Sequence, residues 1–146
     1  MKFRFEKIED GEEEIIARVK KKSSFTDELE QMVASYDLPG EIPGYFGNEI
    51  VMMKVCEIEC FFTEEGKTYA HYSDNRTYIV KKRLYELSEI LPKEFEMISK
   101  SAIANWRKIV KLKAQLSGAV NAVFKSGYVE YISRRCFADL KRRYNL

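Results

Sequence analysis

Residues 119–132 read AVNAVFKSGYVEYI, and this stretch decides the fold class. Two runs rich in apolar and aromatic residues, 119–124 and 128–132, flank Lys125-Ser126-Gly127. A short connection that contains glycine between two such runs is typical of a β-hairpin. We therefore expect a hairpin near the C-terminus and further strands on its N-terminal side.

The chain before this hairpin carries the same signal. Residues 69–72 and 77–80 flank Ser73-Asp74-Asn75-Arg76, whose polar side chains are typical of a turn. Other short apolar runs also predict strands. They are residues 50–62, with one or two strands, 95–98 and 109–112. The fold class is therefore expected to be mainly β, and α+β when the helices are counted.

Two short helices are expected among these strands. Residues 85–91 predict the first helix. Ser133 can cap a second helix, on which Phe137, Leu140 and Tyr144 share one face.

The N-terminal region predicts a small ββα segment. Residues 2–8 and 15–19 carry apolar side chains on either side of the turn-like Glu9-Asp10-Gly11, which favours two short strands. Thr26 resembles a helix N-cap, and apolar residues follow it at helical spacing. These residues are Leu29, Met32, Val33 and Tyr36.

A linker is expected where the sequence reads PGEIPG, at residues 39–44, because this stretch holds two of the three prolines. It divides the chain into a segment 1–44 and a domain 45–146. A segment of this size buries little apolar surface alone, so we expect it to pair with the domain or with a second copy, as in a homodimer.

The charge is unevenly distributed. Residues 1–65 hold 8 Lys and Arg against 16 Asp and Glu, whereas residues 66–146 hold 17 against 7. A basic C-terminal half is typical of a protein that binds the phosphate backbone of nucleic acid. The alternative is an acidic face that packs against a basic one.

Four blocks of sequence, in this order, resemble the LytTR DNA-binding family. They are Glu59–Phe62 with Gly66-Lys67-Thr68, Leu84–Leu91, Phe95–Asn105, and Tyr131–Arg135. Each block is weak alone, but the order and spacing are specific, and they cover about two thirds of the chain. The resemblance implies an elongated β-sheet domain with short helices, whose loops, rather than a helix-turn-helix, enter the major grooves of double-stranded DNA.

The resemblance also implies which residues face DNA. It places Lys67, Lys100 and Arg135 at base-contacting positions, with Ser99 and Ser101 in the same loop as Lys100. Some members have an amide residue in place of Lys100. Because asparagine pairs with adenine whereas lysine and arginine favour guanine, the sequence preference is expected to differ.

Other cations are expected to bind phosphates. Arg134 lies in the first turn of the final helix, where the helix dipole disfavours a cation unless an anion is near. Lys111 and Lys113 alternate onto one face of an expected strand, where the alternative role is solubility of an exposed edge. The run Lys141-Arg142-Arg143 near the C-terminus is also expected to bind phosphates.

Signatures of an enzyme are missing from the sequence. There is no glycine-rich phosphate loop, G-x-S-x-G elbow or H-E-x-x-H motif. The single histidine, His71, is interpreted as a half-buried polar strand residue. Cys56 and Cys60 are expected on one face of a strand, about 13 Å apart and too far to share a zinc ion, and Cys136 is expected to be a small apolar helix residue. We expect no catalysis, no metal, no cofactor and no small-molecule substrate.

The sequence thus predicts a cytoplasmic, one-component bacterial regulator that binds double-stranded DNA. The N-terminus lacks the apolar core of a signal peptide, and no apolar run is long enough to span a bilayer. The resemblance implies control by a partner, often a membrane protein. The alternative is a protein-interaction module that uses its acidic N-terminal segment, and RNA binding is disfavoured because RRM and KH signatures are absent.

Overall fold

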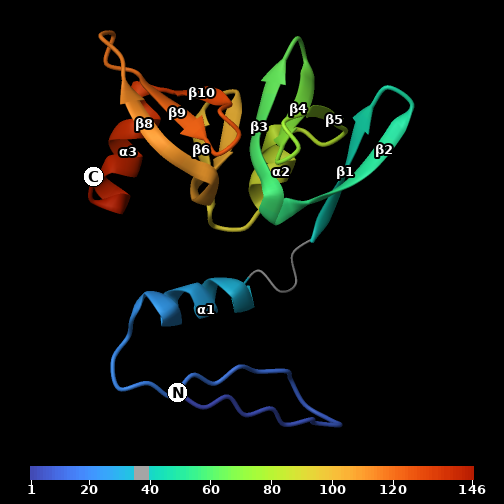
Figure 1. The fold of residues 1–146 in the computed structure, drawn as a ribbon, viewed down its shortest axis with the longest axis vertical. Helices are drawn as coiled ribbons and strands as arrows, with labels where there is room; N and C mark the ends of the chain where they lie inside the picture. Colours follow the sequence, from blue (N-terminus) through green and yellow to red (C-terminus); the bar gives the residue numbers. More distant parts are fainter. Residues whose placement is uncertain (35–39) are drawn as a thin grey trace. The chain divides into compact units, whose positions relative to one another are not determined.

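A computed structural model describes residues 1–34 and 40–146. The chain divides into two compact units, residues 1–36 and 37–146 (Figure 1). None of the described helices is long and apolar enough to cross a membrane.

The N-terminal unit contains helix α1 (Ser24–Ala34) and no strand among its described residues. The two strands expected at 2–8 and 15–19 are therefore wrong. Apolar side chains of both segments stay exposed, with Phe3 at 92% and Ile15 at 62%. Burial of apolar surface within the described unit therefore does not stabilise a pairing of these segments. The expected helix is confirmed, but it begins two residues before Thr26, whose hydroxyl donates to the carbonyl of Ser23. Tyr36 lies outside the described residues.

The larger unit is built on a seven-stranded antiparallel sheet with the order β2-β1-β5-β4-β3-β7-β6. Two connections between its strands are the short 3₁₀ turn η1 (Val55–Glu57) and the helix α2 (Leu84–Ile90). The strands are β1 (Glu41–Phe46), β2 (Glu49–Lys54), β3 (Ile58–Glu64), β4 (Lys67–Tyr72), β5 (Thr77–Val80), β6 (Phe95–Ser99) and β7 (Ala102–Asn105). The expected mainly β fold is confirmed.

Strand β1 occupies most of the stretch that was expected to be a linker. Pro43 and Gly44 lie within it, opposite Met52 and Val51 of β2. Gly44 is buried, and a Cβ atom there would come within 2.8 Å of Met53 and Tyr78, so this glycine allows close packing rather than flexibility. The linker is therefore wrong for residues 41–44, while residue 39 lies outside the described part of the chain.

A three-stranded sheet with the order β10-β9-β8 follows in the sequence. It is formed by β8 (Ile109–Ala114), β9 (Val120–Phe124) and β10 (Val129–Ile132), and the short turn η2 (Trp106–Lys108) leads into it. The expected hairpin around Lys125-Ser126-Gly127 joins β9 to β10. Helix α3 (Arg134–Tyr144) ends the fold, and its cap is the one expected, because the Ser133 hydroxyl accepts from the Cys136 backbone N–H.

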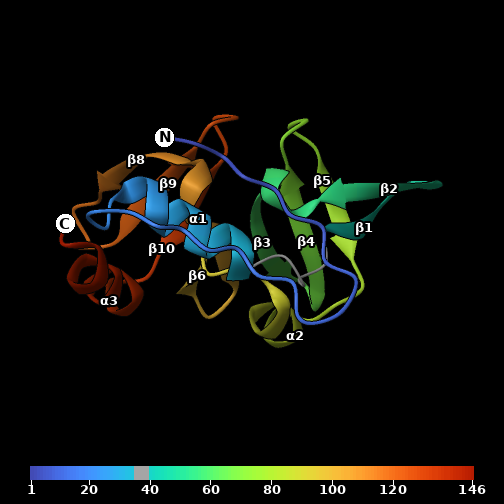
Figure 2. The same ribbon diagram turned by 90° about the horizontal axis from the view of Figure 1, so that it is seen from below.

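Two apolar cores lie in this unit. Phe61 of β3 and Ile103 of β7 belong to the core under α2, whereas Cys60 and Ala104 of the same strands belong to the core under the small sheet and α3. Alternation along a strand sends neighbouring residues to opposite faces, so β3 and β7 serve both cores. Helices α2 and α3 therefore cover different cores, and both are seen at the lower edge of the view in Figure 2.

Polar groups also join the two sheets. The buried Glu59 of β3 accepts from the backbone N–H of Ser126 at 3.1 Å and from its hydroxyl. His71 of β4 is 6% exposed, hydrogen-bonds Thr77 and Asn75, and stacks on Tyr128 with ring centroids 4.2 Å apart. His71 is thus more deeply buried than the half-buried strand residue that was expected.

The cysteines do not share a strand. Cys56 lies in η1 and is exposed, whereas Cys60 lies in β3 and is buried. The expected common strand face is wrong because η1 interrupts the strand between them. Cys136 on α3 is partly buried and packs on the second core, as expected.

Candidate nucleic-acid interface

The tight turn between β3 and β4 presents Lys67. Glu64 and Lys67 are directly opposite each other, so Glu65 and Gly66 form a two-residue turn. Both have positive φ, 51° for Glu65 and 75° for Gly66, which is the backbone of a type I′ hairpin. Lys67 is exposed at the first position of β4.

The turn between β6 and β7 presents Lys100. Lys100 is exposed between Ser99 and Ser101. The Ser99 side chain is largely buried, at 8% exposure, and its hydroxyl accepts from the Ser101 backbone N–H at 3.2 Å. Ser99 therefore shapes the turn from inside, whereas Lys100 and Ser101 are exposed.

The start of α3 presents Arg134 and Arg135, both exposed. Ser133 caps the helix, and the backbone N–H groups of the first turn point out of the helix end. The helix dipole adds partial positive charge at the same place, so this end attracts an anion more strongly than the two guanidinium groups would alone.

Two long-range backbone hydrogen bonds bring these three segments together. The N–H of Thr63, beside the β3–β4 turn, donates to the carbonyl of Ser101 over 2.8 Å. The N–H of Ser133 donates to the carbonyl of Ile98, also over 2.8 Å. The three segments therefore follow one another along a single edge of the domain, although they are far apart in the sequence.

The turn between β8 and β9 lies next to this edge. The Arg134 side chain passes Gly118 of that turn, because a Cβ atom on Gly118 would lie 3.4 Å from Nε of Arg134. In Figure 1 the β8–β9 and β3–β4 turns project to the same side of the domain, at the top of the view. Lys111 and Lys113 are exposed on β8, the strand that leads into this turn.

Two of the three C-terminal cations, Arg142 and Arg143, form ion pairs. Arg143 donates two hydrogen bonds to the Glu96 carboxylate, at 3.0 and 2.8 Å. Tyr144 donates to the same carboxylate and stacks on Trp106. Arg142 pairs with Asp139 at 2.8 Å. Arg143 thus links α3 to β6, whereas the Arg142–Asp139 pair is exposed and lies within α3. Phosphate binding by the run Lys141-Arg142-Arg143 stays a prediction.

A basic run that the sequence analysis missed lies at the same end as Lys67. Val80, the last residue of β5, is paired with Thr68, so Lys81, Lys82 and Arg83 follow immediately beside the β3–β4 turn. All three are exposed, and Lys81 lies over the Tyr45 ring at 4.4 Å. The three consecutive basic residues are the signal in the sequence for a phosphate-binding segment. The strand register shows that they lie beside the β3–β4 turn.

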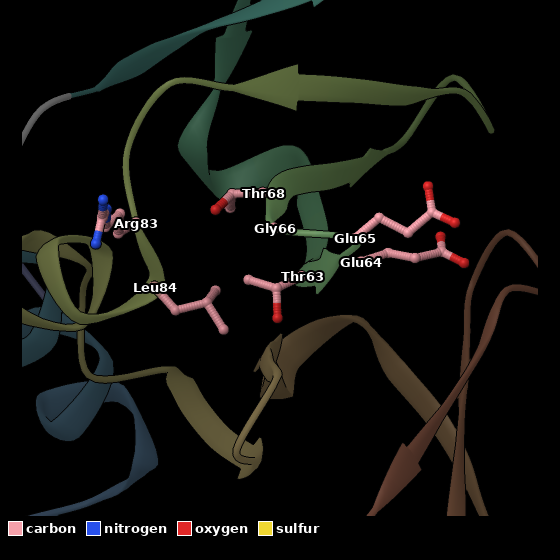
Figure 3. Close-up of a pocket in the computed structure, with 7 residues that line it drawn as sticks. All are labelled: Thr63, Glu64, Glu65, Gly66, Thr68, Arg83 and Leu84. Atoms are coloured by element: carbon pink, nitrogen blue, oxygen red, sulfur yellow. The ribbon is translucent and has the colours of Figure 1, made fainter.

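A shallow depression lies between the β3–β4 turn and the start of α2 (Figure 3). Arg83 stands on one side of it, while Glu64 and Glu65 extend away on the other side. The depression is open, and it lacks the enclosed apolar walls typical of a small-molecule site. It is lined by Thr63, Glu64, Glu65, Gly66, Thr68, Arg83 and Leu84.

Comparisons with known proteins found similar sequences and a similar fold. A family model described as the LytTr DNA-binding domain matches residues 48–145. Two Staphylococcus aureus proteins, from strains NCTC 8325 / PS 47 and COL, are named HTH-type transcriptional regulators. Each is 32% identical to this chain over 114 residues, which is 78% of this chain and 77% of theirs.

The fold also resembles a solved structure. It is the LytTr DNA-binding domain of a methyl-accepting/DNA response regulator from Bacillus cereus, with a TM-score of 0.68 and 16% identity over 74% of this chain and 99% of that one. The relatives' name refers to a helix-turn-helix, but within residues 40–146 the helices α2 and α3 are separated by strands β6 to β10. The β turns and the start of α3 therefore form the candidate interface.

Proposed function

This chain belongs to the LytTr DNA-binding domain family of transcription regulators, and we propose that it recognises specific sequences of double-stranded DNA through the major groove. One observation carries the proposal. Two backbone hydrogen bonds, Thr63 to Ser101 and Ser133 to Ile98, align the segments of Lys67, Lys100 and Arg135 along one edge. A row of exposed cations on rigid turns suits successive contacts along one side of a duplex.

Each of the three residues has chemistry suited to a base edge. Arg135 can donate two parallel hydrogen bonds to O6 and N7 of guanine. Lys100 and Lys67 can each donate to guanine or to a phosphate. A preference for guanine at these positions is therefore part of the proposal.

The surrounding cations would hold the phosphate backbone. Arg134 lies on the edge, and Lys111 and Lys113 lie beside it on β8. Lys82 and Arg83 extend the positive charge beyond the β3–β4 turn. Such contacts fix the register of a protein on DNA without reading sequence. Ser99 and Ser101 are given a supporting role, since they shape the turn that carries Lys100.

The N-terminal segment is proposed to make the protein a homodimer. Several of its apolar side chains are exposed in the described unit, among them Phe3, Phe5 and Met32. Burial of such residues against a second copy would stabilise both. The boundary between the N-terminal segment and the DNA-binding domain, expected after residue 44, is proposed to lie before Glu41, because β1 pairs with β2 and belongs to the domain.

Control by a partner, such as a membrane protein, and action in the cytoplasm remain part of the proposed function. No catalysis, cofactor or small-molecule substrate is proposed. The second candidate function is a protein-interaction module, which the acidic and apolar N-terminal segment favours. The two functions are compatible, because the acidic segment would be repelled by DNA and stay available to a protein.

The proposal is tested by fluorescence anisotropy with labelled duplex from the upstream region of the protein's own gene. Random competitor DNA is added at two salt concentrations. Retained binding under competition supports specific recognition, and the triple variant Lys67→Ala, Lys100→Ala, Arg135→Ala should lose it. Competition by any DNA at equal concentration, or no binding at low salt, would reject the proposal.

A further inference from the structure

Glu65 holds a backbone conformation that does not suit its side chain. Its φ of 51° lies in the left-handed region, where a Cβ atom is crowded by the following carbonyl group. Within residues 1–34 and 40–146, the other non-glycine residues with positive φ are Asn75 and Asn145. Asparagine tolerates this region, and Asn-Gly or Asp-Gly is the usual pair for a type I′ turn. Glu65-Gly66 is thus a strained choice.

The strain falls at the tip of a turn on the proposed DNA-facing edge. Lys67 follows two residues later. The hydrogen bond from Thr63 to Ser101 holds the β6–β7 turn, which carries Lys100, beside the β3–β4 turn. Strained residues that persist at exposed tips point to a role for the side chain, because the fold itself would be served better by another residue.

The charge of Glu65 is also unusual at this place. A carboxylate is repelled by the phosphate backbone, so it weakens binding to DNA in general. Among the base edges of the major groove, however, the N4 amino group of cytosine is a donor that a glutamate accepts from. A carboxylate beside a lysine can therefore complement a cytosine next to a guanine.

We propose that Glu65 is a specificity-determining residue whose carboxylate accepts a hydrogen bond from N4 of a cytosine, next to the base contacted by Lys67. The inference rests on the proposed function and names the base that the β3–β4 turn selects. Glu65 lowers affinity for all DNA through its charge and restores affinity only where this cytosine is present.

Glu64 provides a matched control. It carries the same charge one residue earlier, but it lies on β3 opposite Lys67 rather than at the tip. Its charge also contributes to raising the pKa of Tyr128, which is raised mainly by burial. Glu64→Gln should relieve repulsion from phosphates without changing the base preference.

The experiment is selection of duplexes from a random library by the full chain, by Glu65→Gln and by Glu64→Gln. We expect the wild type to enrich a motif with one cytosine preferred by roughly fivefold or more. Glu65→Gln should lower that preference to within about twofold or transfer it to adenine, which glutamine pairs with. Glu64→Gln should enrich the wild-type motif.

The outcomes separate this inference from the proposed function. If the wild type enriches no motif, the proposed function fails. If a motif is enriched and Glu65→Gln enriches the same one, the proposed function stands and the role of Glu65 is rejected. Glu65→Asn gives a second readout, because asparagine suits the turn. Its melting temperature should exceed that of the wild type, and a value no higher would contradict the strain.

Discussion

The backbone N–H of Ser133 donates to the carbonyl of Ile98 over 2.8 Å. Ser133 directly follows β10 of the three-stranded sheet, whereas Ile98 lies in β6 of the seven-stranded sheet. This bond fixes the first turn of α3 against the end of β6. As a result, Arg135 is carried on a helix whose position is set by the same strand that leads to Lys100. The separation of these two cations is therefore determined by the fold and not by flexible loops.

Arg135→Ala should weaken binding to the cognate site by about 1 to 3 kcal/mol and binding to random DNA far less. The physical reason is that a bidentate contact to guanine is present only on the correct sequence. Anisotropy titrations on both duplexes measure the two losses. Arg134→Ala is the control, since loss of a phosphate contact weakens both equally, and equal losses for Arg135→Ala would remove its role as a base reader.

Lys111→Ala and Lys113→Ala should change the salt dependence of binding. Each phosphate contact releases about one counterion from the DNA when it forms. The double variant lacks two such contacts, so the magnitude of its slope of log K against log salt should be lower by about 2. Binding at several salt concentrations measures this slope. An unchanged slope would assign the two lysines to solubility of the β8 edge.

The three thiols should differ in reactivity. Burial, with the negative charges of Glu130 and Glu59, raises the pKa of Cys60 well above its ordinary value, so this thiol stays neutral and inert at pH 8. Cys56 is exposed and should react first with a thiol reagent. Cys56→Ser should abolish the fast phase, and Cys60 should react only after unfolding. A fast phase that Cys60→Ser removes instead would contradict the structure.

The contact of Tyr144 with Glu96 should weaken at alkaline pH. Burial, the hydrogen bond to Glu96 and its charge raise the pKa of Tyr144 from 10.0 to about 12. The neutral phenol is favoured in the fold, so its contribution to stability is complete below about pH 10 and is lost as the pH rises through 12. The difference in free energy of unfolding between the wild type and Tyr144→Phe should therefore shrink between pH 8 and pH 11. Urea unfolding at both values checks this, and a constant difference would contradict it.

Most strands of the domain could be predicted because their residues alternate or cluster in short apolar runs. Strand β7 was missed because Ala102–Asn105 is short and contains two alanines, which have little strand preference. Strand β1 was missed because Pro43 and Gly44 are typical of loops, and their place in the sheet depends on Met53 and Tyr78 packing closely. The two N-terminal strands show the opposite error, since an apolar pattern without a partner does not form a sheet.

The candidate site was less accessible from sequence than the fold. Lys67, Lys100 and Arg135 could be proposed only through the family resemblance, because exposed cations on turns look alike. Their common edge depends on hydrogen bonds between Thr63 and Ser101 and between Ser133 and Ile98, which join residues distant in the sequence. The same holds for Arg143, whose pairing with Glu96 spans the sequence from α3 to β6. Strand register and long-range pairing are not encoded in local patterns.

Protection of DNA from methylation by dimethyl sulfate tests the central claim most directly. The reagent attacks N7 of guanine in the major groove and N3 of adenine in the minor groove, so it separates the two faces of the duplex. When the protein is bound, we predict that guanines in successive major grooves on one side of the site are protected from methylation. The variant Arg135→Ala should lose protection at one of these guanines. Protection confined to adenine N3, or no protection on a duplex that is demonstrably bound, would contradict recognition through the major groove.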